Sequence, residues 1–432
     1  MLDALRQVAL VAVPKIAGGA LTLGLNIVLL RIWSPETYGI YALCTTFIVL
    51  ADAIVGSSLD LATLRLGSEA RAGDASKGMA LERTALAAKL LASVAALPIV
   101  LLGAESLAVA LFGDARHGNL LIAAYAASVA LLLFRSTLVH AQLGGRFGHY
   151  ALLEATHSAL KFGGIGVLLV VLGEPRVGAV LAFYVAGPAA AFALGLSCLR
   201  GGSLWSPLLD FRRLRELLLY VRWYALSGAV GNLLGRLDLF ILSALAMTHE
   251  VGLFAGAQTF AAVLWLAASY LSIVLSPRIM PMLERGMYRG FHRRVQIALY
   301  ATSALVLAAL LILLDAGLPL FPPSFRESSD LLAILLVGTA VSFATFPLAL
   351  PLVMFRRPRF TLAVDCAAAP VLVVLYGEAI AAYGAEGAAW VTTASLIARG
   401  GIVQVLAWRL SAEPLSAGDA TSAGRIDDGA RP

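Results

Sequence analysis

Residues 295–315 read VQIALYATSALVLAALLILLD, and this stretch decides the fold class. Its first 20 residues carry no formal charge, and the first charged residue is Asp315. A helix needs about 20 predominantly apolar residues to cross the hydrocarbon core of a bilayer. Because the stretch is continuously apolar, and does not alternate over about ten residues, it predicts a transmembrane helix and not a strand of a membrane barrel.

Similar stretches occur along the whole chain of 432 residues, of which 60% are hydrophobic and 13% charged. A soluble chain of this size cannot bury so much apolar surface, so the composition excludes a soluble enzyme and a disordered protein. We therefore expect an all-α polytopic membrane protein with about twelve transmembrane helices. The expected spans are 8–31, 37–58, 84–103, 118–139, 151–172, 178–199, 223–245, 251–275, 295–315, 330–354, 361–376 and 385–409.

The distribution of lysine and arginine predicts the orientation of these spans. With the N-terminus placed inside, about 21 basic residues lie in the inner segments, and three (Arg116, Arg176 and Arg326) lie in outer loops. Such a bias is typical of loops that stay in the cytoplasm. It predicts that both termini are cytoplasmic, and it explains the net charge of +6 without nucleic-acid binding.

An internal repeat predicts how the chain is divided. The segment GIYALCTTF at 39–47 recurs as GLFAGAQTF at 252–260, which is close to half a chain length later. Two halves in the same orientation form a parallel repeat, a common layout of transporters. The expected parts are an N-terminal six-helix bundle (1–200), an amphipathic cytoplasmic linker (201–222), a C-terminal six-helix bundle (223–410) and a disordered tail (411–432). An ordinary basic inner loop is an equally good interpretation of 201–222.

Charged side chains inside these spans are the candidate functional residues, because each costs about 2.5–3.5 kcal/mol on membrane-insertion scales. The deepest cations are Lys15, Lys161, Arg236 and Arg399. If they face one central cavity, they suit an anionic substrate such as a phosphate or pyrophosphate. Polar residues expected to line the same cavity are Thr22, Asn26, Glu154, His157, Asn232, Gln258 and Trp265, and candidates for ion coupling are Asp52, Asp238 and Asp365.

Structural roles compete with these functional ones. We expect Lys89 and Arg135 to extend to the inner membrane surface, because long basic side chains near a span end can reach water. Glu154 can pair with Lys161 or His157 as part of helix packing, and Asp238 can stabilise a packing contact beside Arg236. We find no phosphate-binding G-x-x-x-x-G-K-[ST] loop and no Cys/His cluster, so we expect no catalytic residue, cofactor or metal.

The stretch LRIWSPETYGIYAL at 30–43, followed by LDLATLR at 59–65, resembles the opening of the polysaccharide-transport flippases. These are the O-antigen and exopolysaccharide (Wzx-like) branch of the multidrug/oligosaccharidyl-lipid/polysaccharide exporter (MOP) superfamily. In the second half, RLD at 236–238, EVGLFA at 250–255 and SPR at 276–278 are similar to the family pattern. SSLD at 57–60 departs from the usual Asp-x-Gly-Leu end of the second span.

The resemblance implies two six-helix bundles around a central cavity that opens alternately to each side of a bacterial inner membrane. It implies a substrate of lipid-linked oligosaccharide, usually on undecaprenyl pyrophosphate, and partners among membrane lipid and the polysaccharide polymerase or chain-length machinery. We expect a monomer, because each chain holds both halves. The alternatives are a cation-coupled drug or metabolite exporter of the same superfamily, which would favour deep acids, and a membrane polymerase, for which the outer loops are too short.

Overall fold

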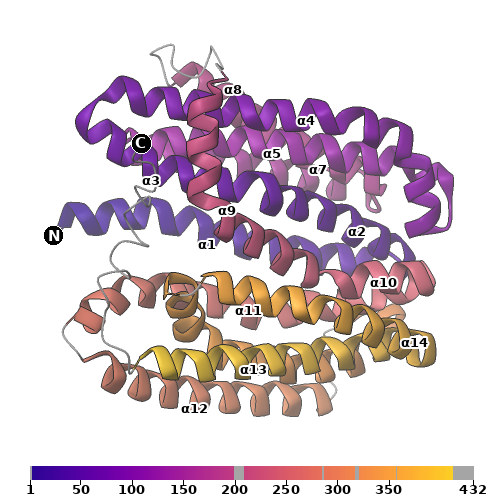
Figure 1. Cartoon of the computed structure of the whole chain (residues 1–432). Coiled ribbons are helices and arrows are strands. Elements are labelled where there is room, and N and C mark those ends of the chain that lie inside the picture. Colours follow the sequence, from indigo (N-terminus) through magenta and orange to yellow (C-terminus); the bar gives the residue numbers. More distant parts are fainter. Residues whose placement is uncertain (1, 199–208, 285–286, 317–320, 357, 412–432) are drawn as a thin grey trace. The chain divides into compact units, whose positions relative to one another are not determined.

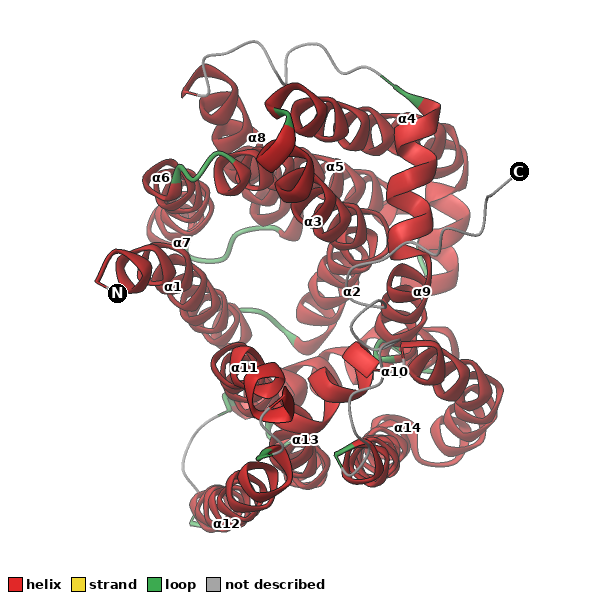
Figure 2. Cartoon of the chain, turned by 60° about the vertical axis from the view of Figure 1, so that its left-hand side comes forward, coloured by secondary structure: helices red, strands yellow, loops and turns green. Residues whose placement is uncertain are grey.

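The computed structural model describes residues 2–198, 209–284, 287–316, 321–356 and 358–411. These residues form helices joined by short turns, and none of them forms a strand (Figure 2). The elements, with π and 3₁₀ segments labelled η, are α1 (Leu2–Ile32), α2 (Pro35–Ala51), η1 (Asp52–Gly56), α3 (Ser57–Gly73), α4 (Ala75–Phe112), η2 (Ala115–His117), α5 (Gly118–Leu143), α6 (Phe147–Ser158), η3 (Ala159–Gly163), α7 (Gly164–Leu172), α8 (Val177–Cys198), α9 (Phe211–Leu234), α10 (Leu237–Leu245), α11 (Thr248–Glu284), α12 (Tyr288–Asp315), η4 (Pro323–Phe325), α13 (Ser328–Arg356) and α14 (Pro358–Leu410).

Among the described residues, ten helices are long and apolar enough to cross a membrane, or eleven if the bent helix α9 is counted as one span. Helix α14 has 53 residues, which at 1.5 Å per residue is about 80 Å and exceeds any bilayer. Its backbone breaks at Gly384, where φ is +56°, so that α14 contains both predicted spans 361–376 and 385–409. The all-helical polytopic fold is confirmed, whereas the layout as two bundles of six stays a prediction.

The chain divides into two compact units, Met1–Arg236 and Leu237–Pro432, and each is described separately here. The division falls after α9, whereas the sequence predicted that the second bundle begins at residue 223. The reason is local packing: Asp210 caps the start of α9, and buried Leu217 packs with Ala62 of α3 and Leu81 of α4. The predicted disordered tail (411–432) lies outside the described residues except for its first residue. Residues 199–208, most of which belong to the predicted linker, also lie outside them.

The predicted span 223–245 was wrong in one respect, because it is not continuous. Helix α9 ends at Leu234, and α10 begins at Leu237 after a turn at Gly235 and Arg236. The Gly235 amide donates back to the carbonyl of Gly231, which closes the first helix. Arg236 therefore lies in a turn between two helices and not along the face of one.

In the N-terminal unit, the motif WSPE at 33–36 is the start of a helix. Ser34 has an extended backbone, and its Oγ accepts a hydrogen bond from the Thr37 amide at 3.4 Å, while Pro35 occupies the first helical position. The buried Trp33 indole donates to the carbonyl of Pro175, 2.8 Å away in the turn before α8. This part of the family-like motif thus fixes the turn between α1 and α2.

Two long helices of this unit, one formed by α2 and α3 and the other by α6 and α7, each contain one π-helical turn. Segment η1 joins α2 to α3, so the helix continues well beyond the predicted end of the second span at residue 58, and η3 joins α6 to α7. A π turn inserts an extra residue and rotates the side chains that follow, and such turns are frequent at functional sites. Asp52 lies in η1 and Lys161 lies in η3.

In the C-terminal unit, α11, α12 and α14 pack against α13, and these four elements run side by side in Figure 1. The core includes Leu275, Leu299, Phe343 and Leu348. At the break in α14, the Glu250 carboxylate of α11 accepts a hydrogen bond of 2.7 Å from the Ala385 amide. The carboxylate thus caps the second half of α14 as an acidic group caps a helix start.

Candidate functional site

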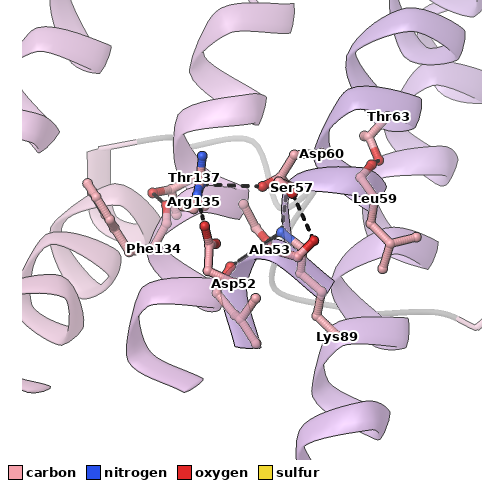
Figure 3. Close-up of polar contacts among 12 residues, drawn as sticks. Asp52, Ala53, Ser57, Leu59, Asp60, Thr63, Lys89, Phe134, Arg135 and Thr137 are labelled. Atoms are coloured by element: carbon pink, nitrogen blue, oxygen red, sulfur yellow. Dashed lines mark hydrogen bonds and ion pairs between the residues drawn. The ribbon is translucent and has the colours of Figure 1, made fainter. Parts of the chain in front are cut away.

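The N-terminal unit contains a buried network of charged side chains between α3, α4 and α5 (Figure 3). The Lys89 ammonium on α4 donates to Asp60 Oδ1 at 2.5 Å and to Ser136 Oγ at 3.0 Å. The Arg135 guanidinium on α5 bonds to the Asp52 carboxylate, and its Nε lies 3.7 Å from Asp60 Oδ2. Two cations therefore face two carboxylates, and the formal charge of the network is zero.

This arrangement corrects the prediction that Lys89 and Arg135 extend to the membrane surface. The Lys89 side chain is 1% exposed. The Arg135 side chain is 37% exposed, and its guanidinium is directed to the Asp52 carboxylate. A buried ammonium next to a carboxylate is stabilised by the local attraction, which removes the need to reach water. Sequence inspection missed this because the four charges lie on different helices, and no single helix pattern shows that they share a depth.

Gly56 explains how the Asp52 carboxylate fits beside α5. A Cβ atom at this position would lie 2.6 Å from Asp52 Oδ1 and 2.7 Å from Leu132 Cδ2. No side chain larger than hydrogen fits there without displacing the carboxylate. Residues of η1 thus bring the Asp52 carboxylate to the guanidinium of Arg135.

A second charged group lies between the same three helices. Arg71 Nη2 on α3 lies 2.5 Å from Glu82 Oε1 on α4, and Glu82 Oε2 bonds to His140 Nδ1 on α5. Both Glu82 and His140 are buried. Together with the first network, this group makes the interface of α3, α4 and α5 rich in charges that compensate one another.

Lys161 has different surroundings, although it belongs to the same unit. Its residue is 9% exposed, and its Nζ lies 4.3 Å from the centroid of the Phe162 ring and 4.7 Å from that of Tyr184. Among the described residues, no carboxylate lies within ion-pair distance of Lys161. Lys161 is therefore a buried cation beside aromatic faces, and the quadrupoles of these rings attract its ammonium group.

A chain of hydrogen bonds connects this lysine environment to helix α1. The Tyr184 hydroxyl lies 2.7 Å from the Tyr41 hydroxyl, which donates to Asn26 Oδ1 at 2.9 Å. The predicted residue Asn26 thus contacts the same group of side chains as Lys161. The Thr22 hydroxyl, in contrast, donates a hydrogen bond within its own helix, to the carbonyl of Gly18 at 2.8 Å.

Lys15, Glu154 and His157 also lie in this unit. Lys15 is exposed on α1, with its Nζ 6.0 Å from the Tyr150 ring centroid, and the Tyr150 hydroxyl donates to Glu154 Oε1 at 3.4 Å. His157 stacks on Phe134, with ring centroids 4.9 Å apart. The structure therefore brings Lys15 and Glu154 to a common tyrosine.

In the C-terminal unit, the predicted acids have partners. Buried Asp238 accepts a hydrogen bond from Gln258 Nε2 at 2.6 Å, and the Thr392 hydroxyl lies 3.4 Å from the same carboxylate oxygen. Arg399 Nη2 forms an ion pair of 3.1 Å with Asp365 Oδ2. The charge of Arg399 is thus compensated locally, which differs from the open cation that its sequence position suggested.

The remaining predicted residues are not brought into these groups. The Asn232 side chain donates to the carbonyl of Gly228 at 2.7 Å, and Trp265 packs edge-on against Phe346. Within the described part of the chain, Arg236 forms no ion pair, and no group of His, Cys, Asp and Glu could hold a metal ion. A common cavity for Lys15, Lys161, Arg236 and Arg399 stays a prediction, since these residues come from both units.

Comparison with solved structures identifies the fold. A structure titled "Lipid II flippase MurJ, inward closed conformation" matches with a TM-score of 0.69 at 13% identity, covering 95% of this chain and 88% of that one. An inward-facing multidrug resistance MATE family transporter matches with a TM-score of 0.67 at 14% identity, covering 94% and 98%. A MOP superfamily transporter from Pyrococcus furiosus matches with a TM-score of 0.63 at 13% identity, covering 94% and 96%.

The chain thus has the fold of these membrane transporters, and the described residues of both helical units include buried charged groups. A family model described as "Polysaccharide biosynthesis protein" matches residues 4–283, well over half of the chain. The chain therefore belongs to this polysaccharide biosynthesis family, and the resemblance inferred from the sequence is confirmed. No curated protein matches the sequence.

Proposed function

We propose that this transporter moves a lipid-linked oligosaccharide of the undecaprenyl-pyrophosphate type from the inner to the outer leaflet for surface polysaccharide synthesis. The description of the family supports this substrate class. The protein would act by alternating access as a monomer in a bacterial inner membrane, with both termini cytoplasmic and without a chemical step. The polysaccharide polymerase and chain-length machinery would receive its product.

The observation that carries this proposal is the environment of Lys161. An intramembrane charge is expensive, and one that has no carboxylate within ion-pair distance is a candidate functional group by default. The aromatic faces of Phe162 and Tyr184 hold the ammonium without neutralising it, so its charge remains available to an anion. A pyrophosphate head group is an anion of this kind, and the exposed Lys15 adds a second positive charge in the same unit.

The cell assay that tests this role uses two lysines of the chain as a matched pair. In a strain whose own flippase gene is deleted, we expect Lys161→Ala to abolish surface polysaccharide while the protein stays in the membrane. Lys77→Ala removes the same charge at an exposed position near the start of α4, and this control should restore normal polysaccharide. Normal polysaccharide with Lys161→Ala, at equal protein level, would exclude the proposed role.

A cation-coupled exporter is the second candidate, and one observation favours it. Asp52 Oδ1 and Asp60 Oδ2 are buried and have no hydrogen-bond partner in the structure. Carboxylate oxygens of this kind can take up a proton during a transport cycle. A deletion strain that becomes sensitive to drugs, with unchanged surface polysaccharide, would favour this candidate over the flippase.

A further inference from the structure

Helix α9 of the N-terminal unit is attached to its neighbours by one side only. Leu217 is buried against Ala62, Leu66 and Leu81, and Tyr220 packs on the same cluster. This contact fixes the helix on α3 and α4, and the Arg213 side chain pairs with Asp210 at the helix start. Among the described residues, no buried cluster covers the opposite side of the first half of α9.

The outward side of α9 carries large apolar residues and arginines in alternation. Phe211, Leu218 and Leu219 are 74%, 49% and 43% exposed. Arg212, Arg215 and Arg222 are also exposed, and at 100° per residue Arg212 and Arg215 project from the same side of the first half of the helix as the three apolar residues. We name these six residues the α9 outer face. Against water alone, three large exposed apolar side chains would be unfavourable, and in the hydrocarbon core three arginines would be unfavourable.

An environment that satisfies both sets of side chains is the boundary between lipid head groups and acyl chains. Apolar residues of an interfacial helix enter the acyl region, and arginines at the same level reach phosphates. Trp223 follows directly, with Arg222 5.5 Å from its ring, and tryptophan is enriched at this depth of a membrane. The helix bends by 61° between Phe211–Tyr220 and Ala225–Leu234, so its two halves do not share one direction.

We propose that the α9 outer face is a docking surface for anionic phospholipid head groups at the membrane interface. Charge complementarity selects the lipid class, because the face has three exposed arginines and no acidic residue, and the exposed acid nearby on the same helix is Glu216. The proposal does not depend on the transported substrate. It assigns the first half of α9 to the membrane surface. From the sequence alone, an ordinary basic loop was an equally good interpretation of 201–222, which includes this half of the helix.

The test measures lipid contact and not transport. The full chain, with its three cysteines replaced by alanine, receives Leu219→Cys and the environment-sensitive fluorophore NBD, and is reconstituted in phosphatidylcholine vesicles with rising phosphatidylglycerol content. We expect NBD emission to increase with phosphatidylglycerol and the increase to fall in high salt. Because each basic residue near an anionic surface is worth about a fivefold change in binding, R212Q/R215Q/R222Q should remove at least about four fifths of this increase.

Two matched variants keep the result interpretable. R212K/R215K/R222K retains the charges and should retain the phosphatidylglycerol response. R116Q/R176Q/R326Q removes three arginines from predicted outer loops and should also leave the response intact. An NBD signal that is independent of phosphatidylglycerol, or one that R212Q/R215Q/R222Q leaves unchanged, would overturn the proposal, whatever the transport activity of the protein.

Discussion

Lys89 and Lys161 are both buried lysines of the N-terminal unit, and their surroundings differ in charge. Lys89 donates to Asp60 and Ser136 within a network whose charges cancel. Lys161 lies between aromatic rings, with no carboxylate partner among the described residues. A compensated cation stabilises helix packing, whereas an uncompensated one is retained at a cost that stability alone does not explain. Under the proposed function, the comparison separates a structural lysine, Lys89, from a lysine that binds substrate, Lys161.

The largest expected effect is on stability and comes from Lys89. Lys89→Ala leaves the buried Asp60 with only the more distant Arg135, and we expect a loss of about 3–5 kcal/mol of stability. The midpoint of thermal unfolding in detergent measures this loss. Lys161→Met, which removes a cation without an ion pair, should leave the midpoint unchanged or raise it. Equal destabilisation by the two variants would remove the distinction between the lysines.

A double variant tests whether the cost at Lys89 comes from the unpaired acid. Lys89→Met with Asp60→Asn removes both charges, and an amide is cheaper to bury than a lone carboxylate. We expect it to recover at least half of the stability that Lys89→Met alone loses, by the same unfolding measurement. No recovery would show that the Lys89 side chain acts through packing and not through charge.

The two π turns beside these lysines provide a smaller, matched comparison. Gly56→Ala places a Cβ against Asp52 and Leu132, and we expect a cost of about 1–3 kcal/mol from this overpacking. At Gly163 in the other π turn, a Cβ would meet nothing within 4 Å, so Gly163→Ala should cost less than about 0.5 kcal/mol. A reversed order in the unfolding midpoints would contradict the packing described around η1.

The smallest expected effect concerns Tyr184. Tyr184→Phe keeps a ring near Lys161 and removes the hydroxyl that contacts Tyr41, for a cost of about 1 kcal/mol. We expect surface polysaccharide to stay normal in this variant. Tyr184→Leu removes the ring as well, and polysaccharide should fall. If Tyr184→Phe and Tyr184→Leu impair the strain equally, the ring face is not what positions Lys161.

Much of this fold could be predicted from the sequence, because bilayer thickness sets helix length and apolar runs show where helices lie. The turn between the predicted spans 8–31 and 37–58, and the position of Lys161 within a helical span, belong to this predictable part. The pairing of Lys89, Arg135 and Arg399 with acids could not be predicted, since it depends on contacts between helices far apart in the chain. The break at Gly235 was missed because Asn232, Arg236 and Asp238 were interpreted as polar residues within one continuous span. The π turns were missed because the sequence analysis treated each span as a regular α-helix.

The most direct test of the central claim measures flipping by purified protein in vesicles, with a fluorescent polyprenyl-pyrophosphate oligosaccharide as substrate. We predict that Lys161→Met, although as stable as the unmodified chain, slows translocation at least about tenfold. This is the loss expected when one charge contact worth about 1.4 kcal/mol is removed. Lys161→Arg, which retains the charge, should preserve most of the rate. Translocation by Lys161→Met at the rate of the unmodified chain would contradict the account.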